Sequence, residues 1–183
     1  ATIHTGDGKV IENGILAVKD KKIAFVGKSS DLPGEMANWT KVDAKGKQIY
    51  PGLIAMNTQL GLTEIEAVEA TSDFSEVGSY TPNVRALIAY NTDSKVIPTV
   101  RSNGILMAET TPQGGIISGR SALVQLDAWN WEDAVLSADE GLFVNWPNPS
   151  VSRRQKSQEA DPENQYLQAV RALYEYFDHA KAY

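Results

Sequence analysis

The sequence predicts an α/β protein in which a β-rich module, residues 1–50, precedes a parallel strand–helix–strand region, residues 51–183. Three observations support this prediction. Short β-rich runs and tight-turn signals fill the first fifty residues. An apolar run follows the Pro51-Gly52 pair, and a helical pattern separates it from a second apolar run. Eight lysines against six acidic residues give residues 1–50 a net charge of +2, whereas nine basic against seventeen acidic residues give −8 afterwards.

The first module contains two turn signals, Thr-Gly-Asp-Gly at residues 5–8 and Glu-Asn-Gly at residues 12–14. The Asn-Gly pair is favoured in two-residue hairpin turns. Residues 15–18 and 23–26 are β-rich, and the charged residues between them predict a hairpin with a polar tip. Residues 42–50 predict one more strand, which leads out of the module.

The second region is arranged around residues 49–62, an apolar run with one polar interruption from Asn57 to Gln59. This run predicts a buried strand. Asn57 and Gln59 are two residues apart, so on a strand their side chains project from the same face. Two amides at the end of an apolar strand suggest the rim of a pocket. Two carboxylates, Glu64 in the acidic segment that follows and Glu109 in the second strand, are further candidates for this pocket.

Residues 83–103 carry apolar side chains at near-helical spacing and predict two helical pieces. Pro98 interrupts the second piece or lies in its first turn. Gly104 ends it, and residues 105–111 predict a second buried strand. A strand, a helix and a strand in this order favour parallel pairing.

Residues 112–121 are the most glycine-dense part of the chain, which allows backbone amides to approach an anion or a carbonyl group closely. A tight irregular turn is the other interpretation, and we favour it. Trp129 and Trp131 either stack on a flat ligand or close an edge of the core, and we favour the second role. Residues 148–161 predict an exposed connection. Residues 162–183 have apolar side chains at helical spacing and predict an amphipathic helix.

Composition excludes several kinds of site. The chain has no cysteine and only two histidines, His4 and His179, so it cannot alone form a thiolate site or a zinc site built mainly of imidazoles. The net charge of −6 argues against nucleic acid as a partner. No run approaches the roughly 20 apolar residues that span a bilayer. The absence of cysteine leaves the compartment open, and we favour export to the periplasm over the cytoplasm.

Residues 5–27, together with Pro51-Gly52-Leu53-Ile54 and Gly61, resemble the N-terminal part of the amidohydrolase superfamily and its imidazolonepropionase-like members. In that family a small β-sandwich precedes a (β/α)8 TIM-type barrel. The resemblance therefore implies a partial β-sandwich over residues 1–50 and the first part of a barrel over residues 51–183. Because a barrel alone takes about 200 residues or more, it also implies a fragment of a longer chain.

The same resemblance locates a departure from the family. The first barrel strand of amidohydrolases carries a His-x-His pair that binds metal; this pair falls on Asn57 and Gln59, and the usual Asp falls on Ala55. Carboxamide oxygens bind Zn²⁺ poorly, so we expect no metal in this segment. A divalent metal such as zinc would need ligands from a missing part of the chain.

Two functions follow from the resemblance. The first is a hydrolase acting on the carbon–nitrogen bond of a non-peptide or cyclic amide, in which a metal ion activates water. The alternative is a non-catalytic protein that keeps the fold and binds a ligand, or serves as the partner subunit of an active homologue. The expected partners are a small-molecule ligand or substrate and a second copy or homologous subunit. The sequence assigns no catalytic residue.

Overall fold

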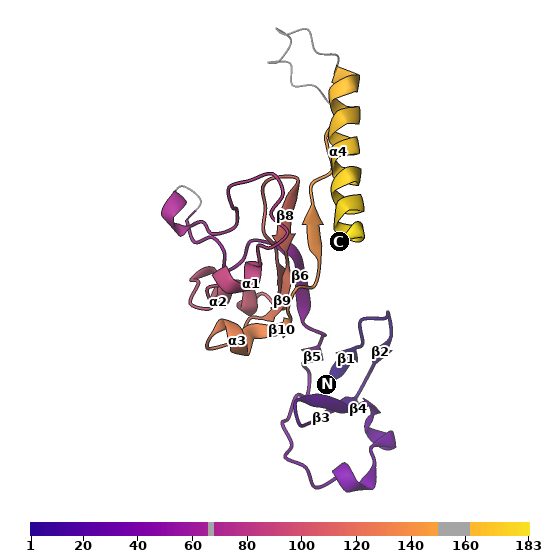
Figure 1. Cartoon of the computed structure of the whole chain (residues 1–183). Coiled ribbons are helices and arrows are strands. Elements are labelled where there is room, and N and C mark those ends of the chain that lie inside the picture. The colour runs from indigo at the N-terminus through magenta and orange to yellow at the C-terminus, as the bar shows by residue number, and fades with distance from the viewer. Residues whose placement is uncertain (66–67, 150–161) are drawn as a thin grey trace. The chain divides into compact units, whose positions relative to one another are not determined.

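The structure is a computed structural model that describes residues 1–65, 68–149 and 162–183 (Figure 1). Contacts within the chain form two compact units, Ala1–Leu53 and Ile54–Tyr183. The division falls just after the Pro51-Gly52 pair at which the net charge changes sign.

The first unit consists mainly of short strands. Strand β1 (Thr2–His4) pairs antiparallel with β2 (Val10–Ile11) and parallel with β5 (Gln48–Ile49). Strands β3 (Gly14–Lys19) and β4 (Lys22–Lys28) form the predicted antiparallel hairpin.

The hairpin turn has a clear local cause. Asp20 and Lys21 both adopt left-handed backbone angles, with φ of 50° and 62°, which is the geometry of the two-residue turn that matches strand twist. Two short 3-10 helices, η1 (Ser29–Asp31) and η2 (Gly34–Met36), follow the hairpin. Several apolar side chains of the unit are exposed, among them Val18, Ile23 and Val42.

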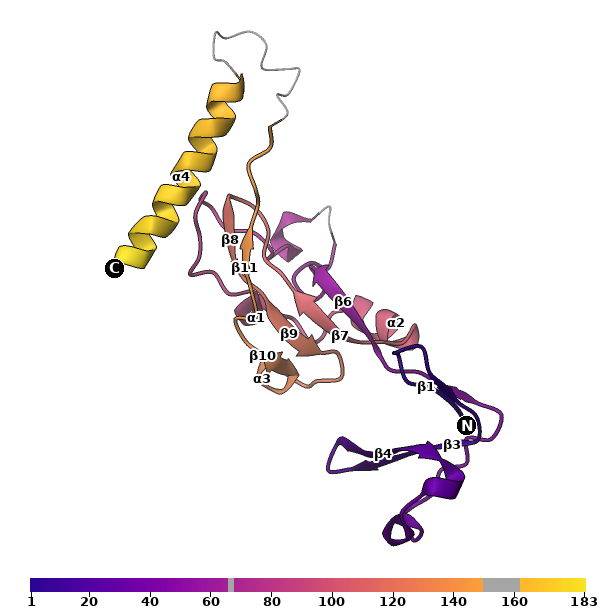
Figure 2. The ribbon, with the colours of Figure 1, turned by 90° about the vertical axis from the view of Figure 1, so that its right-hand side faces the viewer.

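The main sheet of the second unit has the strand order β10-β9-β7-β6. Its members are β6 (Leu53–Thr58), β7 (Ile105–Thr110), β9 (Ala122–Gln125) and β10 (Val135–Ser137). Strands β6 and β7 run in the same direction, as the sequence predicts (Figure 2). A second, two-stranded antiparallel sheet joins β8 (Ile117–Arg120) to β11 (Leu142–Val144).

Beyond β7 the topology differs from the predicted alternation of parallel strands and helices. Strand β9 pairs antiparallel with β7, and β10 pairs antiparallel with β9. The reason lies in the connection: a parallel return needs a crossover of a dozen or more residues, usually a helix, whereas residues 111–121 hold turns and β8. The described residues thus form a mixed α/β unit, and a partial barrel is not shown.

Short helices cover one face of the main sheet. They are α1 (Ala86–Ala89), α2 (Val96–Ser102) and α3 (Trp131–Ala134). Pro98 lies in the first turn of α2, where its missing N–H costs nothing, and Gly104 follows the helix with φ of 87°. The buried core between helices and sheet consists of Leu87, Tyr90, Ile97, Ala108, Ala122, Val124, Leu126 and Ala134.

The β6 edge of the sheet carries exposed apolar side chains in the part of the chain that the structure describes. Leu53, Ile54 and Met56 of β6 are 60%, 46% and 64% exposed, and β6 ends the strand order. An edge strand with uncovered apolar side chains is the kind of surface that proteins normally pair or cover.

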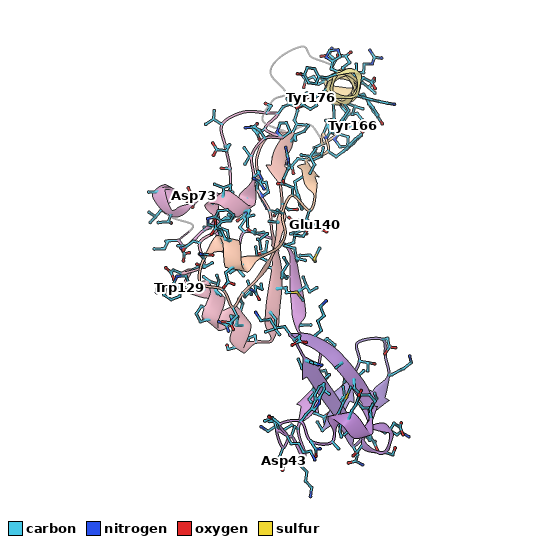
Figure 3. All side chains as sticks on the ribbon, turned by 60° about the horizontal axis from the view of Figure 1, so that its bottom comes forward. Asp43, Asp73, Trp129, Glu140, Tyr166 and Tyr176 are labelled. Carbon is cyan, nitrogen blue, oxygen red and sulfur yellow. The ribbon has the colours of Figure 1, made fainter. Side chains whose placement is uncertain are left out.

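The last element is α4 (Pro162–Ala182), which confirms the predicted C-terminal helix. Tyr176 stacks on Tyr80 with ring centroids 4.8 Å apart, and Trp146 Nε1 donates to the Tyr166 hydroxyl at 3.3 Å (Figure 3). Most of the predicted connection at residues 148–161 lies outside the described residues. None of the described helices combines the length and apolar character that crossing a membrane requires.

Candidate functional site

Four polar residues meet where β6 and β7 end, and we refer to Asn57, Glu109, Thr111 and Ser121 as the strand-end cluster. Ser121 Oγ donates to Glu109 Oε1 at 2.9 Å, and the Asn57 backbone N–H donates to Glu109 Oε2 at 3.4 Å. Thr111 Oγ1 donates to Asn57 Oδ1 at 3.0 Å. Glu109 is only 8% exposed, whereas Asn57 is exposed. The cluster is therefore a buried carboxylate with an amide at its solvent side.

The backbone of Asn57 explains how the cluster forms. Asn57 has a φ of 51°, a left-handed conformation that few residues other than glycine, asparagine and aspartate adopt readily. This left-handed turn of the backbone lies at the end of β6, where the Asn57 N–H donates to Glu109. Just beyond it, the Thr111 N–H donates to the Thr58 carbonyl at 2.9 Å and holds the two strand ends together.

Two arginines of the second unit, Arg85 and Arg120, are paired with a different carboxylate, Asp139. Arg85 Nε lies 2.8 Å from Asp139 Oδ1, and Arg120 Nη1 lies 3.4 Å from Asp139 Oδ2. Arg120 Nε also donates to the Pro82 carbonyl. Within residues 1–65, 68–149 and 162–183, Glu109 takes part in no ion pair. In the same ranges its hydrogen-bond donors are the Ser121 hydroxyl and the Asn57 backbone N–H.

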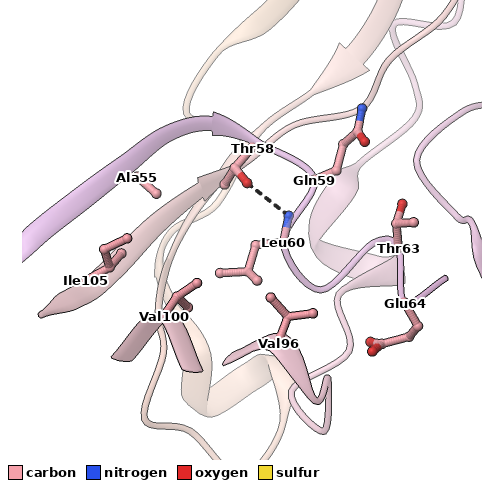
Figure 4. Close-up of a pocket in the computed structure, with 9 residues that line it drawn as sticks. All are labelled: Ala55, Thr58, Gln59, Leu60, Thr63, Glu64, Val96, Val100 and Ile105. Carbon is pink, nitrogen blue, oxygen red and sulfur yellow. Dashed lines mark hydrogen bonds between the residues drawn. The ribbon is translucent and has the colours of Figure 1, made fainter. Parts of the chain in front are cut away.

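A pocket of about 400 Å³ lies between β6 and α2, and we refer to it as the α2 pocket (Figure 4). Its polar lining comes from the β6 end and the loop after it, and the Thr63 hydroxyl there is buried without a hydrogen-bond partner among the described residues. A few polar groups over an apolar floor are typical of ligand pockets. The lining residues are Ala55, Thr58, Gln59, Leu60, Thr63, Glu64, Val96, Val100 and Ile105.

Glu64 has a structural task in this pocket. Its Oε1 accepts from Asn91 Nδ2 at 3.1 Å, and its Oε2 accepts from Ser94 Oγ at 3.1 Å and from the Lys95 N–H at 3.3 Å. The carboxylate thereby ties the loop after β6 to the segment that starts α2. A negative charge beside the first N–H groups of a helix is also favourable.

The structure divides the four predicted pocket residues between two places. Asn57 and Glu109 belong to the strand-end cluster, whereas Gln59 and Glu64 line the α2 pocket. Asn57 and Gln59 were expected on one face of a regular strand. Because Asn57 has a left-handed φ and β6 ends at Thr58, the alternation of faces does not continue to Gln59.

Sequence reasoning missed Thr111 and Ser121 as members of the cluster. Thr111 ends the apolar strand predicted over residues 105–111, so its position at a strand end was the available signal. Ser121 carried no such signal, since its contact with Glu109 depends on β9 returning antiparallel beside β7.

The glycine-dense segment packs against the chain itself, which favours the tight-turn interpretation. A Cβ on Gly119 would lie 2.7 Å from the Val84 carbonyl oxygen, so only glycine fits there. Asn145 Nδ2 donates to the carbonyl oxygens of Gly114 and Gly115 at 3.3 and 3.1 Å.

The two tryptophans differ in their surroundings. Trp129 is 89% exposed (Figure 3), so the expectation that it closes a core edge is wrong. Trp131 is 39% exposed and begins α3, whose first turn is capped by Asn130 through a 2.7 Å bond from the Asp133 N–H. The Asn130 cap accounts for the start of α3 at Trp131, and no ligand is needed to explain it.

The described residues do not fit a metal centre of the family type. His4 lies in the first unit, where it stacks on Tyr50 and hydrogen-bonds to Gln48. His179 is exposed on α4. In the described ranges no three or more His, Asp or Glu side chains gather in a way that could hold a metal ion, and the Asn57 side-chain oxygen already accepts from Thr111.

Known proteins that resemble this chain were found by sequence and by structure. No protein-family model matches the chain. Imidazolonepropionase from Brucella anthropi is 34% identical over 119 residues, which are 60% of this chain and 29% of that protein. Imidazolonepropionase from Methylobacterium nodulans is 30% identical over 119 residues, with shares of 60% and 30%. The chain thus matches less than a third of the length of these curated relatives.

A solved structure adds the fold. An amidohydrolase from Thermotoga maritima superimposes with a TM-score of 0.63 and 16% sequence identity, covering 92% of this chain and 43% of that one. The sequence and structure comparisons together support the amidohydrolase superfamily.

Proposed function

We propose that this chain is part of an amidohydrolase-type hydrolase that acts on the carbon–nitrogen bond of a non-peptide or cyclic amide. The observation that carries the proposal is the 34% identity with an imidazolonepropionase over 119 residues. The similar fold of a solved amidohydrolase supports it. Because the aligned stretch is 29% of the relative, further catalytic residues would come from polypeptide outside this stretch.

The proposed architecture is the first part of a (β/α)8 TIM-type barrel preceded by part of a β-sandwich. Strands β6 and β7, with α1 and α2 between them, supply one parallel strand–helix–strand unit. The exposed Ile54 and Met56 of β6, and the α2 pocket beside it, are surfaces that a further strand and helix would cover.

Hydrogen exchange tests this architecture. In the longest polypeptide that the gene encodes, we expect those amides of residues 53–56 that point away from β7 to be protected, because a neighbouring strand would pair with the β6 edge. In residues 1–183 alone they should exchange quickly, while Ala108, between two strands in β7, stays protected in both. Equal exchange at residues 53–56 in the two polypeptides, or a gene that ends at Tyr183 and yields a stable monomer, would contradict the proposal.

We place the site at the strand-end cluster. Ligands of α/β proteins bind at the carboxyl ends of parallel strands, and β6 and β7 end beside Glu109. The α2 pocket, with Gln59 and Glu64, is on this proposal an element of packing.

A ring-opening assay tests the activity. The longest encoded protein, purified with its native metal content, is incubated with a panel of five-membered cyclic amides, and ring opening is followed by loss of ultraviolet absorbance. We expect turnover of at least one compound, and we expect Glu109→Gln to reduce kcat/KM. A folded protein that opens no ring in the panel would contradict the hydrolase proposal.

One observation favours the non-catalytic alternative. The Asn57 side-chain amide is engaged with Thr111, and by the sequence resemblance Asn57 and Gln59 stand where the family has its first metal-ligand pair. A protein of this kind would bind a small molecule without turnover, or assemble with an active homologue. Saturable ligand binding without ring opening, or a native mass that requires a homologous second subunit, would select this alternative. Export to the periplasm stays a prediction that cell fractionation would check.

A further inference from the structure

We propose that α4 mediates dimerisation: an apolar stripe made of Leu167, Tyr174 and Phe177 packs antiparallel against the same stripe of a second copy of this chain. We refer to these three residues as the α4 stripe. The stripe is separate from the strand-end cluster and from the α2 pocket. The inference therefore goes beyond the proposed hydrolase function and does not depend on it.

The α4 stripe stays exposed although the helix contacts its own unit. Tyr176 provides one such contact through its ring, which stacks on Tyr80. Leu167 and Tyr174 are seven residues apart and Phe177 follows three residues later, so with 3.6 residues per turn the three lie along one flank of the helix. They are 44%, 61% and 41% exposed. Within residues 1–65, 68–149 and 162–183, no element buries this flank.

The spacing of the stripe is that of a surface by which helices pair. Apolar residues at alternating intervals of three and four form the seam of two helices that pack side by side, and the partly buried Val170 fills the interval between Leu167 and Tyr174. Trp146, which is 55% exposed, meets the Tyr174 ring edge to face with centroids 6.4 Å apart and extends the surface. Aromatic side chains are enriched in protein–protein interfaces, which favours a protein partner over a small molecule.

The charges beside the stripe favour a second copy as that partner. Arg171 lies three residues before Tyr174 and Asp178 lies four residues after it. Neither takes part in an ion pair in the described ranges. In an antiparallel pair centred on Tyr174, Arg171 of each copy lies beside the partner's Asp178, which gives two symmetric ion pairs. A parallel pair would instead bring like charges together, which is unfavourable.

The residue at the far end of the stripe fits the same arrangement. Lys181 lies seven residues after Tyr174, and Leu167 lies seven residues before it. In the antiparallel pair the aliphatic stem of Lys181 would cover the partner's Leu167, while its ammonium group stays in water. The apolar pattern and the charge pattern therefore agree on one two-fold arrangement.

The test is analytical ultracentrifugation of the longest encoded protein and of two charge reversals made separately. We expect the unsubstituted protein to dimerise reversibly in the micromolar range, because one helix pair is a small interface. Arg171→Glu would face the partner's Asp178, and Asp178→Arg would face the partner's Arg171, so each variant alone should dimerise at least about tenfold more weakly. An equimolar mixture of the two variants should recover the dimer, since both contacts then join opposite charges.

A control and a second measurement complete the design. Glu140→Arg reverses a charge on the exposed segment after β10 and should dimerise like the unsubstituted protein. The 183 residues contain no cysteine, so Tyr174→Cys adds one thiol at the proposed two-fold axis. A short bismaleimide should join two copies of this variant and leave Leu136→Cys, a control at a 51% exposed position of β10, unlinked. Crosslinking needs neither charge reversal, so it holds even if those variants are unstable.

Several results would overturn the inference. A protein that stays monomeric at millimolar concentration would mean that further polypeptide of the same chain covers the stripe. A dimer that neither reversal weakens, a mixture of the folded variants that does not recover the dimer, or equal crosslinking at positions 174 and 136 would place the contact elsewhere. A complex that forms only with a homologous subunit would also contradict it, because the two-fold charge pattern requires two identical helices.

Discussion

Replacing Gly61 with alanine is expected to lower the free energy of unfolding of the second unit by about 2–4 kcal/mol, from backbone strain and overpacking together. Gly61 has a φ of 79°, and a Cβ added there would lie 2.4 Å from Cε2 of Tyr90. Tyr90 is 5% exposed within the core, and burial raises the pKa of its hydroxyl to about 12. The ring cannot move away without opening the core around Leu87 and Ile97.

Gly104→Ala is the matched control for this prediction. Gly104 also has a positive φ, 87°, but nothing lies within 4 Å of a Cβ added there. It should cost about 1 kcal/mol, the backbone term alone. Urea unfolding of both variants measures the difference, which isolates the contact with Tyr90. Equal losses in the two variants would mean that Tyr90 does not pack against Gly61 as described.

Replacing Glu64 with alanine is expected to cost about 2 kcal/mol, because hydrogen bonds to a carboxylate each contribute more than neutral ones. The substitution leaves Asn91, Ser94 and Lys95 without their common acceptor. This expected loss is well below the sum for three hydrogen bonds to a buried carboxylate. Glu64 is partly exposed, so water replaces part of the lost hydrogen bonding.

Thermal unfolding and hydrogen exchange check this prediction together. The amides at the start of α2 should lose protection in Glu64→Ala, while those of β7 keep it. Glu140→Ala serves as the control, because Glu140 is exposed. If both substitutions have the same small effect, Glu64 does not hold α2 to the loop after β6.

Local signals predicted much of the fold. The charged tip between two β-rich runs gave the β3–β4 hairpin, whose Asp20 and Lys21 take the turn angles that such a tip needs. The helical spacing after residue 162 predicted α4. The helical pattern before Gly104 predicted the parallel relation of β6 and β7, since a helix between two strands makes a parallel return feasible.

Features that depend on distant contacts were not predicted. The antiparallel return of β9 beside β7 brings Ser121 to Glu109, and no local pattern encodes that register. The left-handed φ of Asn57 separates it from Gln59, although the two residues look equivalent in the alternation of a strand. Trp129 is exposed, and the Asn130 side chain caps the start of α3.

The central proposal is an amidohydrolase-type frame in which Asn57 and Gln59 take the place of the first metal-ligand pair. Its most direct test is a metal analysis of the longest encoded protein. Elemental analysis gives the stoichiometry, and an anomalous-scattering map of its crystals gives the position. The account predicts no zinc, iron or manganese at Asn57 or Gln59. A stoichiometric ion within about 2.5 Å of either side-chain oxygen, near the usual ligand distance of about 2.0–2.2 Å, would contradict it.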